Sequence, residues 1–303
     1  MYDMIILGAG PGGMAAAIYA KRAELNVLMI ERLPVSGGQI INTYEVDNYP
    51  GIPGISGFAL GEKFGEHCKR LEVPRREAEV TAVSVENGIK KVTLENGEVL
   101  ETKTLVIATG ASNRLLGVPG EEDLTGMGVS YCATCDGAFF KNRTVAVIGG
   151  GDVAVEDAIF LARICEHVYL IHRRDTFRAA KSLVSALKRY ENVEILYDSV
   201  CEEIKGEDSV EGMVVKNRIT GESRTLNVNG VFIAVGITPN SGLFTDIVDN
   251  ENGWIKADET CETSVPGIYA VGDVRTKQLR QVITAAADGA NAVTSAERYL
   301  MTL

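Results

Sequence analysis

Two cysteines separated by two residues are the part of this sequence best suited to redox chemistry. Cys132 and Cys135 lie in the segment CATCDG, and Asp136 directly follows the second cysteine. Such a pair can close a small disulfide and exchange two electrons as a unit. Asp136 is either a general acid for a thiolate leaving group or a turn residue before the next glycine. The segment predicts a redox-active dithiol.

Zinc binding and structural cross-linking are the two other roles open to this pair. A zinc site needs two further Cys or His ligands at suitable spacing. The other four cysteines are isolated, and the three histidines lie in predicted helices or at strand ends. A structural disulfide would close too short a loop to stabilise much, and a reducing cytosol would open it. We therefore favour the redox dithiol and expect no metal.

The first 31 residues have the order of a dinucleotide-binding site. We predict a buried strand over Tyr2–Leu7, a glycine-rich loop, an Ala-rich helix to about residue 24, and a strand over Val27–Ile30. In such sites the glycines let the backbone approach a pyrophosphate, and an acid at the second strand end binds ribose hydroxyls. A tight turn without a ligand is the alternative. The candidate residues are Gly8, Gly10, Pro11, Gly13, Glu31 and Arg32.

A second copy of this pattern begins after the cysteine pair. It comprises a strand over 144–148, a glycine loop, a helix over 155–165 and a strand over 168–171 that ends in His172. His172 lies as far after Gly149 as Glu31 lies after Gly8, which predicts two units of one architecture. Similar segments close the two copies, IATG at 107–110 and IAVG at 233–236. The further candidates are Gly110, Gly149, Gly151, Asp152, Val153, Ala154 and Gly236.

The two copies differ where the second strand ends. The first copy has the acid Glu31 there, whereas the second has His172, Arg173 and Arg174, with Arg178 four residues further on. Basic groups at this position can clamp a 2′-phosphate, which indicates NADP rather than NAD. A solvated basic face is an alternative for Arg178 alone.

The cysteine pair and the two nucleotide sites together imply a flavin. Nicotinamide delivers hydride, whereas a disulfide accepts electrons through thiolate chemistry, so a flavin is the natural converter between them. We therefore expect FAD in the first site and NADPH in the second.

The rest of the chain contains elements without evident chemistry. We predict an amphipathic helix over 58–71, a hairpin meander over 79–101, a strand over 267–271 and a helix over 279–300. Because the last helix follows the second unit, it either caps that unit or completes the first.

Composition limits the partners. The 303 residues are 46% hydrophobic and 23% charged, as in soluble globular proteins. The net charge of −11 argues against a general nucleic-acid surface. The apolar start is broken by glycines and lacks a basic segment, and no apolar run is long enough to span a bilayer. We expect a cytoplasmic protein with no nucleic-acid or membrane partner.

With these motifs in hand, the sequence closely resembles the bacterial-type low-molecular-weight thioredoxin reductases over essentially the whole chain. The matching segments are GAGPGG at 8–13, GGQ at 37–39, NYPG at 48–51, CATCDG at 132–137, GGGDVA at 149–154, HRRDTFRA at 172–179, GIYAVGD at 267–273 and RQ at 280–281.

The resemblance implies an α/β fold with two Rossmann-like domains of the pyridine nucleotide-disulfide oxidoreductase type, a three-layer ββα arrangement, in a homodimer. The FAD domain would comprise 1–112 and 246–303, and the NADPH domain 115–243. The implied FAD contacts, beyond those above, are Gly38, Gln39, Asn48, Gly272, Asp273, Arg280 and Gln281.

The resemblance further implies thioredoxin-disulfide reductase activity, with hydride passing from NADPH to FAD, then to the Cys132–Cys135 disulfide, and then by exchange to thioredoxin. Cys135 would lie nearer the flavin, Cys132 would be the exchange thiol and Asp136 the acid/base. Since the cysteines lie in the NADPH domain, that domain would move between two positions.

One residue departs from the family pattern, and two other functions stay open. Met127 stands where many relatives carry a basic residue that helps to dock thioredoxin. The alternatives are a reductase of the same fold that serves another dithiol protein or is fed by ferredoxin, and a non-enzymatic nucleotide-binding redox sensor.

Overall fold

The protein divides into two compact units that share one chain discontinuously. The computed structural model describes residues 1–43 and 45–303. Unit 1 comprises residues 1–41, 55–112 and 238–303, and unit 2 comprises 42–54 and 113–237. The domains expected from the sequence place residues 42–54 in the first domain and residues 238–243 in the second, whereas the two units divide them the other way. The domain limits stay a prediction.

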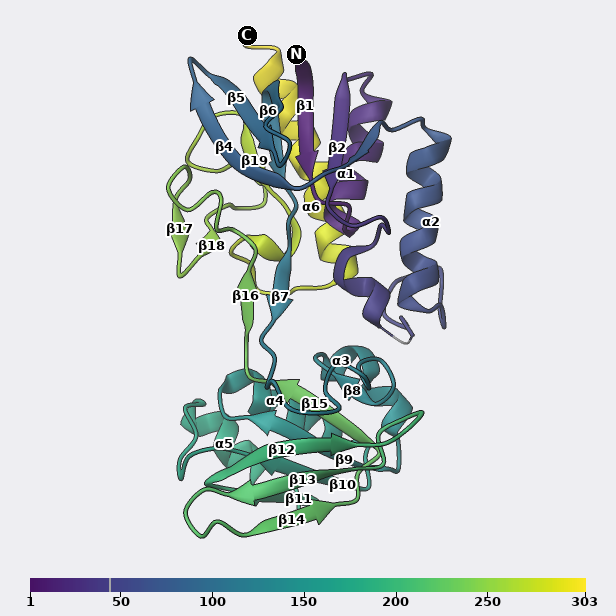
Figure 1. Ribbon diagram of the computed structural model, residues 1–303, viewed down its shortest axis with the longest axis vertical. Coiled ribbons are helices and arrows are strands. Elements are labelled where there is room, and N and C mark those ends of the chain that lie inside the picture. The colour runs from purple at the N-terminus through teal and green to yellow at the C-terminus, as the bar shows by residue number, and fades with distance from the viewer. Residues whose placement is uncertain (44) are drawn as a thin grey trace. The chain divides into compact units, whose positions relative to one another are not determined.

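A seven-stranded sheet forms the centre of unit 1 (Figure 1). Its strand order is β3-β2-β1-β6-β5-β4, and β19 also pairs with β6. The β1–β2, β1–β6 and β19–β6 pairs are parallel, whereas β4, β5 and β6 form the predicted antiparallel meander. The strands are β1 (Tyr2–Leu7), β2 (Val27–Glu31), β3 (Arg75–Glu77), β4 (Val80–Glu86), β5 (Ile89–Leu94), β6 (Val99–Ile107) and β19 (Ile268–Ala270).

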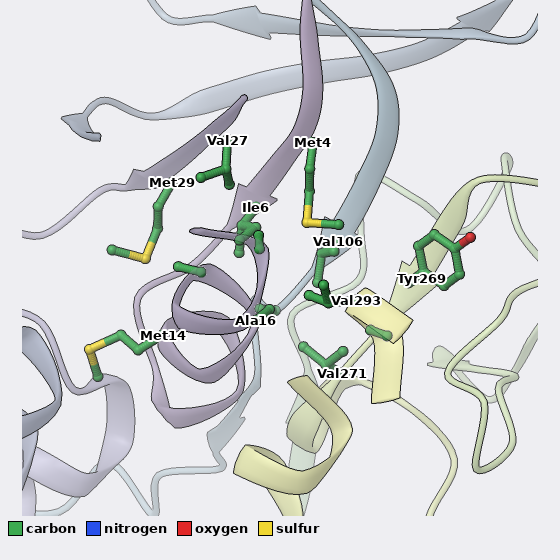
Figure 2. Close-up of a cluster of buried hydrophobic side chains, with 14 of the residues drawn as sticks. Met4, Ile6, Met14, Ala16, Val27, Met29, Val106, Tyr269, Val271 and Val293 are labelled. Carbon is green, nitrogen blue, oxygen red and sulfur yellow. The ribbon is translucent and has the colours of Figure 1, made fainter. Parts of the chain in front are cut away.

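The last helix, α6 (Val282–Leu300), completes unit 1. It packs along α1 (Pro11–Arg22) because small residues on both helices allow the backbones to approach closely. A Cβ at Gly289 would lie 2.3 Å from the carbonyl oxygen of Gly12. Figure 2 shows the core around these helices, in which Val293 of α6 lies with strand residues such as Met4. The sequence left open which unit this helix belongs to, and this packing decides it.

Unit 2 repeats the plan with a second parallel sheet. The strand order is β11-β10-β9-β15-β8, and a separate antiparallel sheet has the order β12-β13-β14. The elements of the unit are β8 (Val129–Ser130), α3 (Ala133–Asp136), β9 (Thr144–Gly149), α4 (Asp152–Ala162), β10 (His167–Ile171), α5 (Lys181–Leu187), β11 (Val193–Leu196), β12 (Ser199–Lys205), β13 (Gly212–Asn217), β14 (Ser223–Leu226) and β15 (Gly230–Ala234).

The internal repeat expected from the sequence is confirmed by the strand pairing. In unit 1, β1 lies between β2 and β6; in unit 2, β9 lies between β10 and β15, and all these pairs are parallel. In both units the central strand leads through a glycine loop into a helix. The fold is the predicted doubled nucleotide-binding architecture, with each loop at the carboxyl end of its central strand.

The remaining elements are short. The chain passes between the units at β7 (Ala111–Asn113) and β16 (Ile237–Pro239), which pair with each other. The others are the 3₁₀ helices η1 (Gly38–Asn42), η2 (Gly137–Phe140) and η3 (Gly272–Val274), the helix α2 (Gly57–Arg70), and the strands β17 (Asn250–Glu251) and β18 (Trp254–Ile255). No helix in the described part of the chain has the length and hydropathy needed to cross a bilayer.

A buried lysine lies inside unit 1. Lys90 of β5 has no exposed surface, and its Nζ donates to the carbonyl oxygens of Gly88 (3.0 Å) and Lys103 (2.8 Å). The Nζ also lies 4.9 Å from the centre of the Tyr299 ring. Burial lowers the pKa of Lys90 from 10.5 to about 8, because the charged form loses its hydration.

We expect the contribution of Lys90 to folding stability to rise with pH. Between the folded pKa of about 8 and the unfolded value of 10.5, the unfolded chain binds the proton more tightly, so raising the pH favours the folded state. We would measure the free energy of unfolding of wild type and of Lys90→Met in urea at about pH 7.5 and about pH 9.5. From the lower to the higher pH, the value for wild type should rise by on the order of 1 kcal/mol relative to that of the variant. If the difference in free energy of unfolding between the two proteins is the same at both pH values, the pKa of Lys90 is not lowered in the folded state.

Candidate redox and nucleotide sites

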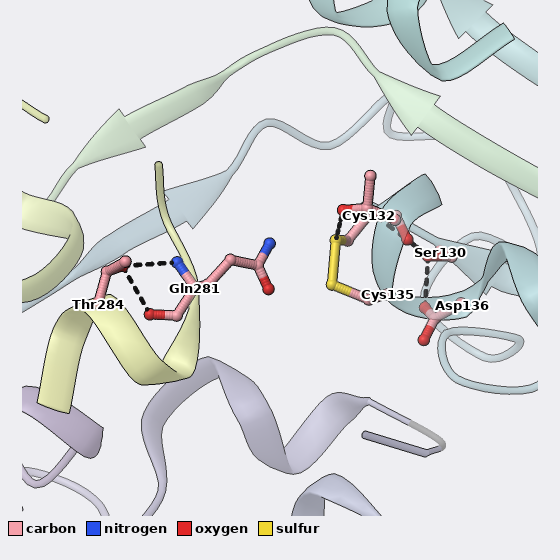
Figure 3. Close-up of a disulfide and its surroundings, with 7 residues drawn as sticks. Ser130, Cys132, Cys135, Asp136, Gln281 and Thr284 are labelled. Atoms are coloured by element: carbon pink, nitrogen blue, oxygen red, sulfur yellow. Dashed lines mark hydrogen bonds between the residues drawn. A yellow bond between two sulfur atoms is a disulfide. The ribbon is translucent and has the colours of Figure 1, made fainter. Parts of the chain in front are cut away.

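The predicted cysteine pair forms a disulfide at the start of a short helix in unit 2 (Figure 3). Cys132 is the N-cap residue of α3, and Cys135 lies one turn further on, with the two Cα atoms 5.2 Å apart. Both cysteines are partly exposed, whereas Ala133 between them is buried in the core. The backbone between the two cysteines is therefore anchored in the core, while both cysteines stay partly exposed.

Asp136 lies beside the disulfide in a setting that favours its protonated form. Its Oδ2 accepts a 2.5 Å hydrogen bond from the Ser130 hydroxyl, and its buried Oδ1 has no hydrogen-bond partner among the described residues. Burial raises the pKa of Asp136, and the bond from Ser130 opposes this only in part. Ser130 also accepts from the backbone N–H of Cys132 at 3.1 Å, so it links the carboxyl group to the cysteine backbone.

Each of the two glycine loops contains glycines that the fold requires, as Gly13 and Gly149 show. A Cβ at Gly13 would lie 1.9 Å from the carbonyl oxygen of Gly8, and one at Gly149 would lie 2.5 Å from that of Ala234. Both distances are far below contact distance. Gly13 therefore lets the start of α1 pack against the backbone of its own loop, and Gly149 lets the end of β9 pack against the backbone of β15.

Each loop also contains a glycine that nothing in the chain requires. A Cβ at Gly10 or at Gly151 would meet no described atom within 4 Å, and both residues have extended backbone that any residue adopts. Both are the N-cap residues of their helices, where the backbone N–H groups bind anions. A pyrophosphate approaching the loop would explain the missing side chain, so both loops fit the predicted dinucleotide ligands.

Glu31 lies at the end of β2, as expected. Its Oε2 accepts from the N–H of Ala9 (2.7 Å) and its Oε1 from that of Leu33 (3.0 Å), so it braces the glycine loop. Each carboxylate oxygen keeps a further lone pair for a ribose hydroxyl.

Two further charged groups of unit 1 each have one buried atom without a hydrogen-bond partner. The buried Oδ1 of Asp273 and the buried Nε of Arg280 have no hydrogen-bond partner in the part of the chain that the structure describes. Burial raises the pKa of Asp273, while the positive charges of Lys277 and Arg280 lower it. Arg280 also lies 3.9 Å above the ring of Trp254. Unsatisfied buried polar atoms are rare and fit a polar ligand such as FAD.

The basic segment after β10 is held as an ordered turn. The buried ring of His172 fills the space beside Gly150, and its Nε2 lies 2.8 Å from the Thr176 carbonyl oxygen. The N–H of Arg178 donates to the carbonyl of Gly150 at 2.8 Å. The three arginines are exposed. His172 thus shapes the turn, while the arginines present positive charge to solvent, as a 2′-phosphate site needs.

The other candidate residues are placed with less chemical detail. Pro11 is the first residue of α1, Asp152 Oδ1 accepts from the Ala180 N–H at 2.7 Å, and Gln281 is the N-cap of α6. Asn48 is grouped by its contacts with unit 2 rather than unit 1, so its contact with FAD stays a prediction. Gly110 and Gly236 accept from the backbone N–H groups of Asn240 and Arg114, and Gly272 donates to Asp288. The remaining candidates are placed by secondary structure and exposure: Arg32, Gly38, Gln39, Val153 and Ala154.

The comparison with known families decides the family. The model of the pyridine nucleotide-disulphide oxidoreductase family matches residues 2–289. This chain belongs to that family. Its thioredoxin reductase members use FAD and NADPH, which agrees with the open glycines and unpartnered polar atoms described above.

Similar proteins are named thioredoxin reductases. The chain is 43% identical to that of Peptoclostridium acidaminophilum, over 99% of this chain and 97% of the relative, and 42% identical to that of Bacillus subtilis, over 99% and 95%. The crystal structure of thioredoxin reductase from Streptococcus pyogenes is 44% identical, with a TM-score of 0.95 over 100% of this chain and 99% of that chain.

Sequence reasoning missed two residues that form hydrogen bonds with candidate site residues, Ser130 with Asp136 and Asp288 with Gly272. Ser130 precedes the cysteine motif and reads as an ordinary strand residue. Asp288 lies in the alanine-rich run AAADGA, yet it is buried and binds Arg275 at 2.7 Å. A single acid on the apolar face of a predicted helix was the available signal for Asp288.

We expect Gly151→Ala to weaken NADPH binding without destabilising the protein. The new methyl group meets no described atom of the chain but occupies the space through which a pyrophosphate would approach. The dissociation constant for NADPH should rise by at least about tenfold, while bound FAD and the melting temperature stay at wild-type values.

Gly242→Ala is the matched control, because Gly242 is equally open but lies outside both loops. It should leave NADPH binding unchanged. Equal NADPH affinity in Gly151→Ala and wild type would show that the loop does not hold the pyrophosphate.

Proposed function

We propose that this protein is an NADPH-dependent thioredoxin-disulfide reductase. The observation that carries the proposal is the Cys132–Cys135 disulfide within a unit whose nucleotide loop is followed by three exposed arginines. An accessible dithiol in the same unit as a site fitted to NADPH is what an electron path from NADPH to a protein disulfide requires. The similar thioredoxin reductases support it, and they give no support to a ferredoxin-fed reductase or a non-enzymatic sensor.

The two units would hold the two cofactors. The loop around Gly10, with Glu31 and Asp273, would hold FAD in unit 1. The loop around Gly151, with the basic turn after β10, would hold NADPH in unit 2. When bound, FAD accepts the hydride of NADPH and releases the electrons as a pair to a disulfide. The chain's own residues bind and orient these groups.

The reduced cysteine pair would then exchange with thioredoxin. The Cys132 thiolate attacks one sulfur of the thioredoxin disulfide, which breaks that bond and forms a mixed disulfide. The Cys135 thiolate next attacks the Cys132 sulfur, re-forms the internal disulfide and releases thioredoxin as a dithiol. Asp136, whose pKa is raised by burial, would supply a proton to a departing thiolate. Ser130 would keep its carboxyl group beside the cysteine backbone.

Three further properties belong to the same proposal. The protein would work as a homodimer in the cytoplasm, with thioredoxin as its protein substrate. The NADPH-binding unit would alternate between two positions, with the joints in the segments that contain β7 and β16. Gel filtration of the holoprotein tests the dimer.

We expect Cys135→Ser to separate disulfide reduction from cofactor binding. The variant cannot re-form the internal disulfide. Steady-state oxidation of NADPH with thioredoxin from the same organism should therefore fall at least about a thousandfold. FAD should stay bound, and NADPH should still bleach it under anaerobic conditions. NADH should be a poor substitute, because it lacks the 2′-phosphate. A sensor would instead show little thioredoxin-dependent NADPH oxidation even in wild type.

Met127 gives a test of how the partner docks. Met127 is 45% exposed and lies between Gly126 and Gly128. Its backbone N–H donates to the Leu124 carbonyl oxygen, and its carbonyl oxygen accepts from the Val210 N–H, so the backbone of this turn is fixed. If a basic residue here contributes to docking, Met127→Arg should lower the KM for a heterologous thioredoxin about threefold to tenfold, with kcat unchanged.

Ile219→Arg is the control for the added charge. Ile219 is 78% exposed and also lies in unit 2, in the turn that joins β13 and β14. It should leave the KM unchanged. The same fall in KM in both variants would mean that net charge, rather than contact at Met127, governs docking.

A further inference from the structure

A buried carboxylate on α6 is surrounded by cations. Asp288 is 4% exposed, and it accepts from Arg275 through Nε (2.9 Å) and Nη2 (2.7 Å) and from Lys277 through Nζ (2.8 Å). Burial opposes its ionisation, but the hydrogen bonds from Arg275 and Lys277 outweigh this and lower the pKa of Asp288. The carboxylate is therefore ionised and shared by two cations.

The same carboxylate fixes the backbone of the turn that follows β19. Its Oδ2 accepts from the N–H of Gly272 at 2.8 Å. Arg275, held by Asp288, also donates to the carbonyl oxygens of Ala257 (3.1 Å) and Thr276 (3.0 Å). Three residues of the turn over 272–277 therefore donate hydrogen bonds to the side chain of Asp288, which lies on α6.

This turn carries Asp273, which has a buried oxygen atom without a partner in the described chain. It also meets the first glycine loop. A Cβ at Gly12 would lie 3.6 Å from the Gly272 nitrogen and 3.1 Å from the Ala285 carbonyl oxygen. The loop, the turn and α6 therefore come together at their backbones, and Asp288 is the side chain that links the last two.

We infer that Asp288 is a positioning residue of the FAD site, which holds the Gly272 turn so that Asp273 faces the cofactor. This inference rests on the proposed function, in which unit 1 binds FAD. A buried ion pair adds little net stability, because desolvation of the charges offsets their attraction. Its use is to specify one conformation of the turn. The cluster also carries one positive charge more than Asp288 neutralises, and the positive charge of Lys277 offsets part of the effect of burial, which raises the pKa of Asp273.

Release of FAD from the purified holoprotein tests this role. Asp288→Asn removes the charge that gathers Arg275 and Lys277, and Asp288→Glu keeps the charge but displaces the carboxylate by one methylene. Both variants should release FAD at least about tenfold faster than wild type, followed by the rise of flavin fluorescence on dilution. The visible absorption of the bound flavin should also shift.

Ser295→Ala is the matched control. Ser295 is another buried polar residue of α6, but its hydroxyl donates to the carbonyl of Thr260 (2.9 Å), outside the turn. It should lower the melting temperature while leaving FAD release within about twofold of wild type. A purely structural role for Asp288 would give the same pattern in its variants, a lower melting temperature with wild-type FAD release, and would overturn the inference.

Two outcomes separate this inference from the proposed function. Wild-type protein purified without FAD, and unable to take it up, would sink the proposed function. If wild type contains FAD and both Asp288 variants release it at the wild-type rate, only the positioning role of Asp288 is wrong. If Asp288→Asn does not fold, Asp288→Glu still decides, because its buried cations remain paired with a carboxylate.

Discussion

Backbone-to-backbone contact at two strand-to-helix turns is the constraint on which the rest of this molecule depends. A side chain at Gly13 or Gly149 would overlap a carbonyl oxygen of a neighbouring turn or strand. Because none is present, α1 and α4 begin directly at the carboxyl ends of their central strands, where the first-turn N–H groups have no partner within the helix. Every other group of the two sites is arranged around these helix starts.

Most of the fold could be predicted from local sequence patterns. Glycines, alternating apolar strands and strand-end charges are encoded within about thirty residues, so both nucleotide loops, the meander and the parallel pairing were predictable. The place of α6 was not. Its apolar face could cover either sheet, and the choice depends on the contact of Gly289 with the backbone of Gly12, which joins distant parts of the chain.

The contacts that tune the sites were the part that sequence could not supply. Ser130 and Asp136 are six residues apart, but their hydrogen bond depends on how β8 enters α3. Asp288 and Gly272 approach each other only because helix and turn pack together. A motif records which residue types recur at a site. It does not record which buried acceptor satisfies which donor.

The burial of the other four cysteines separates the working pair from every other thiol in the chain. Cys68, Cys165, Cys201 and Cys261 are all buried, and burial raises the pKa of each to about 11 or 12. They therefore carry almost no thiolate at neutral pH and are poor targets for oxidants and electrophiles. Once reduced, Cys132 and Cys135 alone are exposed to such reagents. An electrophile that labels a thiol of the reduced protein should therefore react mainly at Cys132 or Cys135, the pair proposed to reduce thioredoxin.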